Sequence, residues 1–340
     1  MSISARLFSF VALLSLATGR AAVAAAPSAV PPWEARFLEA PPAEVLEASR
    51  KVTVPDDAGV VLLLEERVVT FEKDGKSKTR YRSVFKILKE SSVRGWAETN
   101  ASWDEWLGPK PTIRARVITK DGRAHLLDPK TIEISGGDGR DDEVYSDSRS
   151  LRAPLPAVAA GAVVEEEVVV EEGPLLAGAG LNGRWFMGSA VPLMKSRLVL
   201  DAPAELKVAV VQKLPAPISP ARTEHDGRVR LVYEAGPIEP LADPEPDGPT
   251  DVPAAPYVGY ATGTSWKDVG ARYAAVVDAQ IAGSDLRAIV HEAREAGPRD
   301  TDALIGRLLA RLHREVRYTG VEFGEASIVP RRPQEVLERH

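Results

Sequence analysis

The sequence predicts a mainly β fold, an antiparallel β-sandwich, followed by a small α-helical segment. Between residues 58 and 240, short runs of β-branched and aromatic residues are separated by turn residues. No helical pattern interrupts these runs, which disfavours a parallel α/β sheet because such a sheet needs crossover helices. After a proline-rich stretch, the hydrophobic period becomes that of an amphipathic helix.

These changes of pattern predict the domain organisation. We expect a signal peptide at 1–24, an Ala- and Pro-rich linker with a short helix at 25–57, a β-sandwich at 58–240, a proline-rich linker at 241–262, and an incomplete helical domain at 263–340. Strands first and helices afterwards indicate two domains. The helical part alone would bury too little apolar surface to be stable.

The predicted export signal begins at Met1 and ends near Ala24. Arg6 supplies the positive charge, Leu7–Ala17 forms an apolar core too short to span a bilayer, and Ala22-Val23-Ala24 fits a cleavage site. The alternative is a buried N-terminal helix. No later run approaches the ~20 apolar residues of a membrane helix. We therefore expect a periplasmic or secreted protein that does not span the membrane.

The strands open with a hairpin. Val60–Phe71 and Tyr81–Leu88 face each other across Lys73-Asp74-Gly75-Lys76, a typical turn sequence. The second strand alternates apolar and charged positions, which indicates one buried and one wet face. Further strands are predicted at 112–119, 124–127, 131–135, 162–171, 184–189, 196–200, 206–211 and 229–234.

Three helices follow the proline-rich stretch. Ser265 caps the first, on which Trp266, Tyr273 and Ile281 share one stripe. The second covers Leu286–Ala296 and ends at a Gly-Pro pair. The third is capped by Asp300 or Thr301 and repeats leucine at the interval of a core-facing helix.

The composition excludes several functions. The 340 residues suffice for about two domains, and 43 Lys and Arg against 49 Asp and Glu give a net charge of −6. Nucleic acid is therefore not expected as a partner, since it requires a basic face. The sequence contains no cysteine, which excludes disulfides, thiolate metal sites and a thiol nucleophile within these residues. No cofactor or metal is predicted.

The segment 318–340 carries the strongest functional signal. It consists of two blocks, Tyr-Thr-Gly-Val-Glu and Pro-Arg-Arg-Pro-Gln-Glu-Val-Leu, and the second opens a helix. Pro333 suits a first helical turn because its missing N–H would be unpaired there anyway. A helix of about two turns is marginal in water unless it packs on something. The segment therefore predicts the entrance to a site.

Both blocks resemble the approach to the active site in the transglutaminase-like superfamily, whose members continue into a Gly-Asp-Cys nucleophile with a later His and Asp. The residues that match the approach are Tyr318, Gly320, Val321, Glu322, Pro330, Arg331, Pro333, Glu335, Val336 and Leu337. His340 belongs to the same approach and is not the catalytic His. No catalytic residue is carried over to this chain.

The resemblance implies a truncated α+β domain and a parent activity of cysteine-dependent acyl transfer or peptide or amide cleavage. In that chemistry a thiolate at a helix N-terminus attacks an amide carbonyl and forms a thioester. The activity is expected to be silent in this chain, which lacks the Cys.

The strand-rich part resembles a domain-of-unknown-function family that precedes transglutaminase-like domains in exported bacterial proteins. The similar features are Lys86-Ile87-Leu88, the hairpin Ala115–Gly122, the segment Tyr145–Arg149 and the step Pro156–Gly161. The resemblance covers roughly residues 55–240 and implies no assigned biochemical role.

Two loops carry residues that ligand sites use. Residues 178–183 fit the pattern G-x-G-x-x-G, but strand-like residues follow, and the pattern binds a pyrophosphate only between a strand and a helix. The acidic loop with Asp138, Asp141, Asp142 and Glu143 lacks the alternating spacing of a calcium loop. A sheet connection and a solvated loop are therefore favoured.

Three tryptophans form a cluster within eleven residues. Trp96, Trp103 and Trp106 could stack on a sugar, although lining the core is favoured. Asp104 and Glu105 could form a glycosidase acid pair, but nothing in the sequence fixes their separation. His125, His225, His291, His313 and His340 show no metal-binding spacing.

The alternative function is a non-enzymatic binding or scaffolding module. In this hypothesis the sandwich holds a peptide, a protein or a glycan. An in-frame Gly-Asp-Cys in the downstream DNA would favour the enzyme, and a stop codon would favour the binding module.

Overall fold

The computed structural model describes residues 30–136, 144–146, 148–242, 253, 255–263, 265–298, 300–317, 320–322 and 324–339. The chain divides into two units, 1–30 and 31–340, and the description below concerns the second. The predicted signal peptide and the acidic loop with Asp138 and Glu143 lie outside the described residues.

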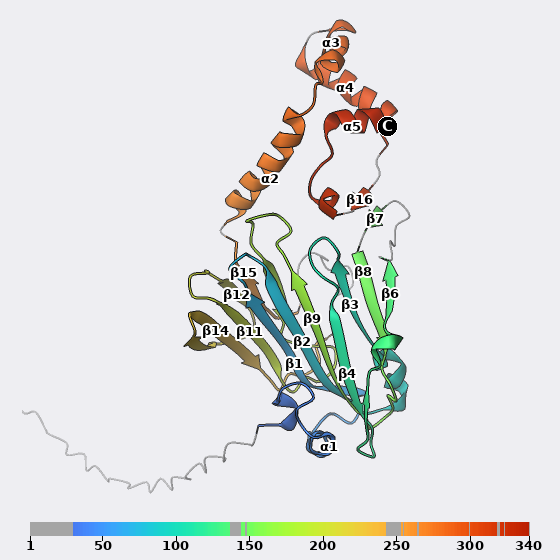
Figure 1. Cartoon of the computed structure of the whole chain (residues 1–340), viewed down its shortest axis with the longest axis vertical. Coiled ribbons are helices and arrows are strands. Elements are labelled where there is room, and N and C mark those ends of the chain that lie inside the picture. Colours follow the sequence, from blue (N-terminus) through green and yellow to red (C-terminus); the bar gives the residue numbers. More distant parts are fainter. Residues whose placement is uncertain are drawn as a thin grey trace, which may run out of the picture. The chain divides into compact units, whose positions relative to one another are not determined.

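One eight-stranded sheet organises the fold (Figure 1). In chain order its strands are β1 (Val60–Phe71), β2 (Ser77–Ile87), β4 (Thr112–Ile118), β5 (Ala124–Leu126), β9 (Val163–Glu172), β11 (Ser196–Pro203), β13 (Ala221–His225) and β14 (Arg228–Ala235). Their order in the sheet is β13-β14-β11-β1-β2-β9-β4-β5. The pair β1–β11 is parallel, and the other neighbours are antiparallel.

Two three-stranded sheets and a short parallel pair complete the strands. One sheet has the order β3-β8-β6 and consists of β3 (Glu98–Asp104), β6 (Glu133–Gly136) and β8 (Ser148–Pro154). The other has the order β10-β15-β12 and consists of β10 (Asn182–Phe186), β12 (Ala209–Lys213) and β15 (Tyr257–Ala261). The parallel pair joins β7 (Val144–Ser146) and β16 (Gly320–Glu322).

The helices lie before and after the strands. The α-helices are α1 (Pro42–Arg50), α2 (Trp266–Ala282), α3 (Arg287–Glu295), α4 (Thr301–Glu315) and α5 (Pro333–Arg339). The 3-10 turns are η1 (Pro32–Glu34), η2 (Glu90–Trp96), η3 (Pro129–Thr131) and η4 (Gly324–Ser327). None of the described helices is long and apolar enough to cross a membrane.

The predicted hairpin is confirmed and fixes which residues face inwards. Glu72 donates its N–H to the Lys76 carbonyl at 2.8 Å, and Gly75 has φ of +87°, a value that glycine adopts without strain. The β1–β2 register shifts between Leu62 and Leu64, which marks a bulge. A bulge reverses the alternation of faces along its strand. Before the bulge, the even-numbered residue Leu62 points to one face of the sheet. After the bulge, the odd-numbered residues of β1 point to that same face.

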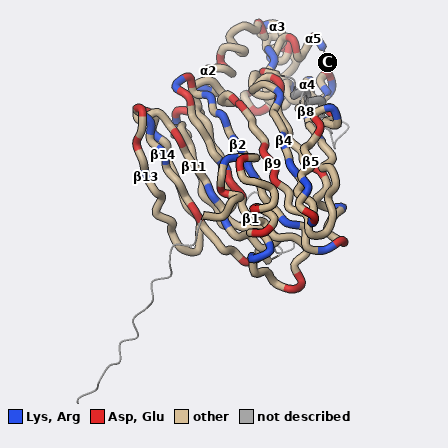
Figure 2. Tube along the Cα trace, turned by 60° about the horizontal axis from the view of Figure 1, so that its bottom comes forward, with Lys and Arg blue, Asp and Glu red and all other residues tan. Residues whose placement is uncertain are grey.

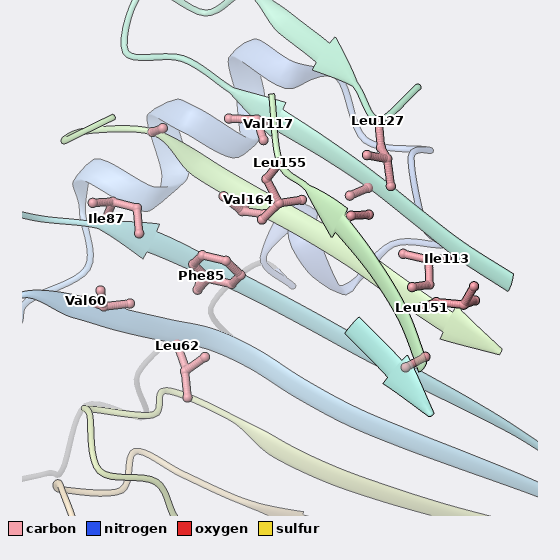
Figure 3. Close-up of a cluster of buried hydrophobic side chains, with 14 of the residues drawn as sticks. Val60, Leu62, Phe85, Ile87, Ile113, Val117, Leu127, Leu151, Leu155 and Val164 are labelled. Carbon is pink, nitrogen blue, oxygen red and sulfur yellow. The ribbon is translucent and has the colours of Figure 1, made fainter. Parts of the chain in front are cut away.

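The inner face of the large sheet is covered by the two small sheets, which confirms the mainly β prediction. Over β2, β4 and β9, the β3-β8-β6 sheet contributes Ala101, Trp103, Leu151 and Ala153 to one core. Figure 3 shows Leu151 of this set together with Phe85, Ile113 and Val164 of the large sheet. Over β1, β11 and β14, strand β15 contributes Val258 and Tyr260 to a second core. Burial of apolar surface in both cores holds the layers together.

The outer face is covered in part by residues 31–54, which were predicted as a linker with a helix. Trp33, Val45 and Leu46 are buried against Leu63 and Val84 of the large sheet. The predicted helix is confirmed as α1. Its apolar side belongs to the core, so this segment is an integral layer of the domain.

Buried charges join this segment to the outer face. Arg116 donates to Glu165 at 2.5 Å and to the Ala40 carbonyl at 3.1 Å, and Arg82 donates to the Trp33 carbonyl at 2.7 Å. Glu165 is only 1% exposed. Acidic and basic residues lie interspersed along β2, β9 and β4 (Figure 2). A buried charge is tolerated only when it is paired, so these contacts specify how residues 31–40 dock.

The cluster continues along β1 and β11. Glu66 pairs with Arg80 and Arg197 at 3.0 Å each, and Arg197 also pairs with Glu34. Burial alone would raise the pKa of the Glu34 carboxyl, but hydrogen bonds from Lys195 and Arg197 lower it overall. Glu34 is therefore held in its ionised form.

Several strands differ from the expectation. β15 lies inside the range predicted as the linker 241–262, yet it pairs with both β10 and β12. β3 and β8 were not predicted, because Ser, Asn, Ala and Arg dominate them and their buried positions include only a few apolar side chains. The predicted caps are confirmed: Ser265 accepts from the Asp268 N–H, and Asp300 accepts from the Ala303 N–H.

Candidate functional site

The first block of the predicted site approach forms a strand. Gly320 and Glu322 bound β16, which pairs in parallel with β7, so that Gly320 lies opposite Val144 and Glu322 opposite Ser146. Tyr318 lies outside the described residues. The backbone of this block is therefore placed beside a segment that is distant in the sequence.

The second block leads into α5. Pro330 and Arg331 precede the helix, and Pro333 is its first residue. Val336 donates its N–H to the Arg332 carbonyl at 3.2 Å, which closes the first turn. Glu335 lies in that turn, where a negative charge is favoured by the helix dipole. Arg332 approaches the end of α2, since a Cβ added to Gly283 would lie 3.4 Å from its Nε.

The glycine-rich loop 178–183 is a connection between strands and not a nucleotide site. Gly183 lies within strand β10, so no helix follows the G-x-G-x-x-G pattern. Gly178 and Gly180 adopt φ of +73° and +81°, as a tight sheet connection requires. Among the described residues, no group of three or more Asp, Glu or His is placed to hold a metal ion.

Two of the three tryptophans, Trp96 and Trp103, line the core as the favoured alternative predicted, whereas Trp106 is half-buried and belongs to none of the three core clusters. Trp103 is buried, and Trp96 packs on Phe85 with ring centroids 5.0 Å apart. Glu105 forms an ion pair with Arg149 at 3.3 Å. His225 is the last residue of β13, and its Nε2 lies 3.8 Å from Asp201 Oδ2.

A groove on the inner face was not predicted from the sequence. A cavity of about 460 Å³ lies between consecutive residues of β3 and the inner face of β9 and β2. It is lined by Tyr81, Glu166, Val168, Val170, Glu172 and residues 98–102. A second cavity of about 170 Å³ shares Ser102, Val170 and Glu172 with the first. Together they form one groove along β3, called the β3 groove below.

Acidic side chains dominate the polar lining of the β3 groove. Glu98, Glu166 and Glu172 line it, and no Lys or Arg does among the described residues. Glu98 already pairs with Arg152 at 2.9 Å. Burial raises the pKa of Glu166 to about 7, and a hydrogen bond with Thr99 opposes this only in part. Of these three carboxylates, Glu98 alone has a Lys or Arg partner within the described part of the chain, so Glu166 and Glu172 face the groove without one.

Beside the groove, an arginine lies against two aromatic rings. The Arg67 guanidinium stands 4.8 Å from the Tyr81 ring centroid and 5.4 Å from that of Tyr260. Arg67 also donates to the Arg184 carbonyl of β10 at 3.0 Å. Burial raises the pKa of both tyrosines, although Arg67 opposes this. The rings are therefore neutral hydrogen-bonding groups at physiological pH.

A signal for the groove was present in the sequence of β9. Its inner face carries Val164, Glu166, Val168 and Val170, so one carboxylate interrupts an apolar row. A charged residue on a core-facing row is unusual and indicates either a partner or a cavity. The register that brings β3 beside this row depends on non-local packing and is not visible in the sequence.

The fold is similar to that of several solved proteins. A candidate protease from Parabacteroides distasonis matches with a TM-score of 0.62 and 13% identity over 83% of this chain. This chain spans 55% of that protein. An M1 zinc metallopeptidase from Deinococcus radiodurans matches with 12% identity and a TM-score of 0.30, and the match covers 59% of this chain and 42% of that protein. At these identities the similarity concerns the fold alone, and the second score is too low to support an argument.

A candidate nutrient-binding protein from Legionella pneumophila shows 10% identity and a TM-score of 0.28, with 78% of this chain and 83% of that protein covered. No curated protein matches the sequence. The family described as a domain of unknown function with a solved structure (DUF3857) matches residues 73–242, which is half of the chain. The strands that form the large sheet and the β3 groove fall mostly within this match, and the chain therefore belongs to the DUF3857 family.

Proposed function

We propose that this chain is the β-sandwich and the leading part of a transglutaminase-like domain in an exported protein. The parent activity would be cysteine-dependent acyl transfer or cleavage of a peptide or amide. The approach residues position the helix from which the nucleophile follows, and the Cys, His and Asp come from outside these 340 residues. The chain itself lacks the Cys and is silent in this chemistry.

The observation that carries this proposal is the apolar surface of the C-terminal helices. None of the described residues of α2, α3, α4 or α5 is buried. Trp266 is 90% exposed, and Tyr273 and Ile281 stand exposed on the same stripe of α2. On α4, the side chains of Ile305, Leu309 and Leu312 are likewise exposed. Amphipathic helices normally bury such stripes, so these faces fit a domain that further residues complete.

The likeness to the candidate protease from Parabacteroides distasonis adds support. It extends over 83% of this chain, which is more than the sandwich alone, and this chain spans 55% of that protein. A protease would use the same attack on an amide carbonyl, with water as the final acceptor. Transfer and cleavage differ only in that acceptor.

The test begins with the DNA after the codon for His340. An in-frame Gly-Asp-Cys, followed by codons for His and Asp, supports the proposal, whereas a stop codon there contradicts it. The longer polypeptide and its Cys→Ala variant are then treated with a fluorescent iodoacetamide at pH 6. A thiolate activated by a helix N-terminus and a histidine should be labelled, and the variant should not.

Export is proposed from the sequence of residues 1–24. The check is N-terminal sequencing of the mature protein from the periplasmic fraction. The expected first residue lies just after Ala24, because a signal peptidase cleaves after a small-x-small motif. Recovery of the intact N-terminus in the cytoplasm would contradict this.

A second candidate function is a non-enzymatic binding module. The observation that favours it is the β3 groove, which has an apolar floor and, as far as the described residues go, a strand edge without a partner and carboxylates without a cation. This function needs no residue beyond those present.

A further inference from the structure

We propose that the free edge of β3 binds an extended peptide as an added strand, and that the peptide carries lysine or arginine on the side facing Glu166. This inference rests on the binding-module function and names its ligand class. It is independent of acyl transfer, because every residue that it uses belongs to the described sandwich.

One edge of β3 has no strand partner in the part of the chain that the structure describes. In its sheet β3 is the outer strand, and within the described ranges its one strand partner is β8. Leu155 donates its N–H to the Ala97 carbonyl at 2.8 Å, which sets the phase of the ladder. Because hydrogen-bonded pairs alternate in an antiparallel ladder, odd-numbered residues of β3 bond to β8. The backbone groups of Glu98, Asn100 and Ser102 therefore point outwards, into the groove.

This edge of β3 opens on a cavity rather than on packed side chains. Residues 98–102 all line the groove of about 460 Å³. An added strand would lie about 4.8 Å from β3, and its side chains would alternate between the floor and the solvent. Exposed strand edges with such a floor are the sites of β-strand addition.

The floor of the groove combines acidic and apolar residues. Along β9 the groove presents Glu166, Val168, Val170 and Glu172, all on the inner face. Thr99 hydrogen-bonds Glu166 at one end, and Ser102 lies beside Val170 and Glu172 at the other, so β3 and β9 run alongside each other. Every second side chain of a strand bound in the groove would face the floor. Four such side chains in a row would contact an acidic, an apolar, a second apolar and a second acidic residue.

The carboxylate of Glu166 determines the charge that the peptide should carry. Glu166 has no cationic partner in the groove, and a half-buried carboxylate without one is costly. A peptide ammonium or guanidinium would supply the missing charge in a partly dehydrated site. The matching sequence is basic-x-apolar-x-apolar-x-basic, which has the same pattern in both chain directions.

The test uses the 340-residue chain and a fluorescein-labelled peptide, Lys-Thr-Val-Thr-Val-Thr-Lys, followed by fluorescence anisotropy. Saturable binding is expected, and a peptide with Glu in place of both Lys residues should bind at least tenfold more weakly. No saturable binding up to millimolar peptide, or equal binding of both peptides, would overturn the proposal.

Proline variants test the strand edge. Asn100→Pro removes an N–H that faces the groove and should weaken binding at least tenfold. Ile134→Pro is the matched control. The odd-numbered residues of β8 form hydrogen bonds with β3, so its even-numbered residues form them with β6. Ile134 lies opposite Leu151, an odd-numbered residue, and its N–H therefore points to the far edge of the same sheet. The affinity of this variant should stay within twofold of wild type. Equal affinities for Asn100→Pro and wild type would overturn the proposal.

Two measurements keep the test decisive if Asn100→Pro does not fold. Because alternate N–H groups face β3 in the two strand directions, one peptide is N-methylated at its threonines and a second at its valines, and one of the two should bind wild type at least tenfold more weakly while the other is little affected. Glu166→Gln with Glu172→Gln should weaken the lysine peptide about tenfold and reduce the salt dependence of binding. Unchanged affinity of both N-methylated peptides would contradict strand addition, and unchanged affinity of the glutamine variant would contradict charge recognition.

Failure here is distinguishable from failure of the acyl-transfer proposal. Peptide binding is measured on a chain without cysteine, whereas thiol labelling requires the longer polypeptide. Each result therefore stands or falls by itself.

Discussion

Glu65 and Glu166 lie in one row across the inner face of the large sheet, on either side of Ser83. The register pairs Ser83 with Glu65 on β1 and with Glu166 on β9. Burial raises the pKa of Glu65 to about 7, and the charge of Glu166 adds to this increase. Glu166 itself has a pKa of about 7. Burial is therefore the main cause of the raised pKa of both carboxyls, and the charge of Glu166 is a further cause for Glu65.

This pair makes stability depend on pH. The folded-state pKa values of about 7 exceed the ordinary glutamate pKa of 4.5, so the folded state binds more protons between these two pH values. The pair's stabilisation is fully present below about pH 4.5 and is lost as the pH rises through 7. The variant Glu65→Gln with Glu166→Gln should be more stable than wild type at pH 8, by about 2 kcal/mol per carboxyl after a discount for partial exposure.

Urea unfolding at pH 5 and pH 8 measures this difference. The gain of the double variant should be large at pH 8 and small at pH 5. Glu72→Gln, at an exposed position, is the control and should show no such trend. A gain that is the same at both pH values would show that the carboxyls are ionised throughout.

The buried cluster on the outer face predicts a second effect. Glu165→Ala leaves Arg82 and Arg116 buried without their shared carboxylate. The loss should be about 3–5 kcal/mol, as for other broken buried ion pairs. Glu171 lies in β9 like Glu165 but forms an exposed ion pair with Lys78 of β2. Glu171→Ala breaks this pair and should lower the free energy of unfolding by about 0.5 kcal/mol or less. Denaturant unfolding of both variants checks the ratio.

Residues 31–54 give a third prediction. Leu46→Ala removes a buried side chain of α1 and should destabilise the domain by about 2–4 kcal/mol, because a cavity remains. Glu44→Ala lies on the exposed side of the same helix and should change stability by about 0.5 kcal/mol at most. If Leu46→Ala is as neutral as Glu44→Ala, the segment is a detachable linker.

The sequence predicted well wherever local pattern decides the structure. The β1–β2 hairpin, α1 and the caps Ser265 and Asp300 follow from turn chemistry, periodicity and capping. Strand β15 was hidden because its residues Tyr257–Ala261 follow a proline-rich stretch and gain their partners from β10 and β12. The β3 groove was hidden for a similar reason: neither the pairing of β3 with β8 nor its position over β9 is a local property. Tertiary contacts override weak strand propensity in both cases.

The last prediction concerns the C-terminal helices. α1 and α3 have nine residues each, but α1 buries Val45 and Leu46, whereas no described residue of α3 is buried. Regions with few buried apolar contacts open at low free energy and exchange their amide hydrogens quickly. In hydrogen–deuterium exchange, α3 should therefore exchange at least about tenfold faster than α1. The exposed stripes of α2 and α4 predict equally fast exchange for those helices.

In a longer polypeptide that completes the domain, α2 to α4 should gain protection while α1 stays unchanged, because only the C-terminal faces acquire new partners. Protection of α3 equal to that of α1 in the 340-residue chain would mean that these helices are already a self-contained domain, and the acyl-transfer proposal would lose its main support.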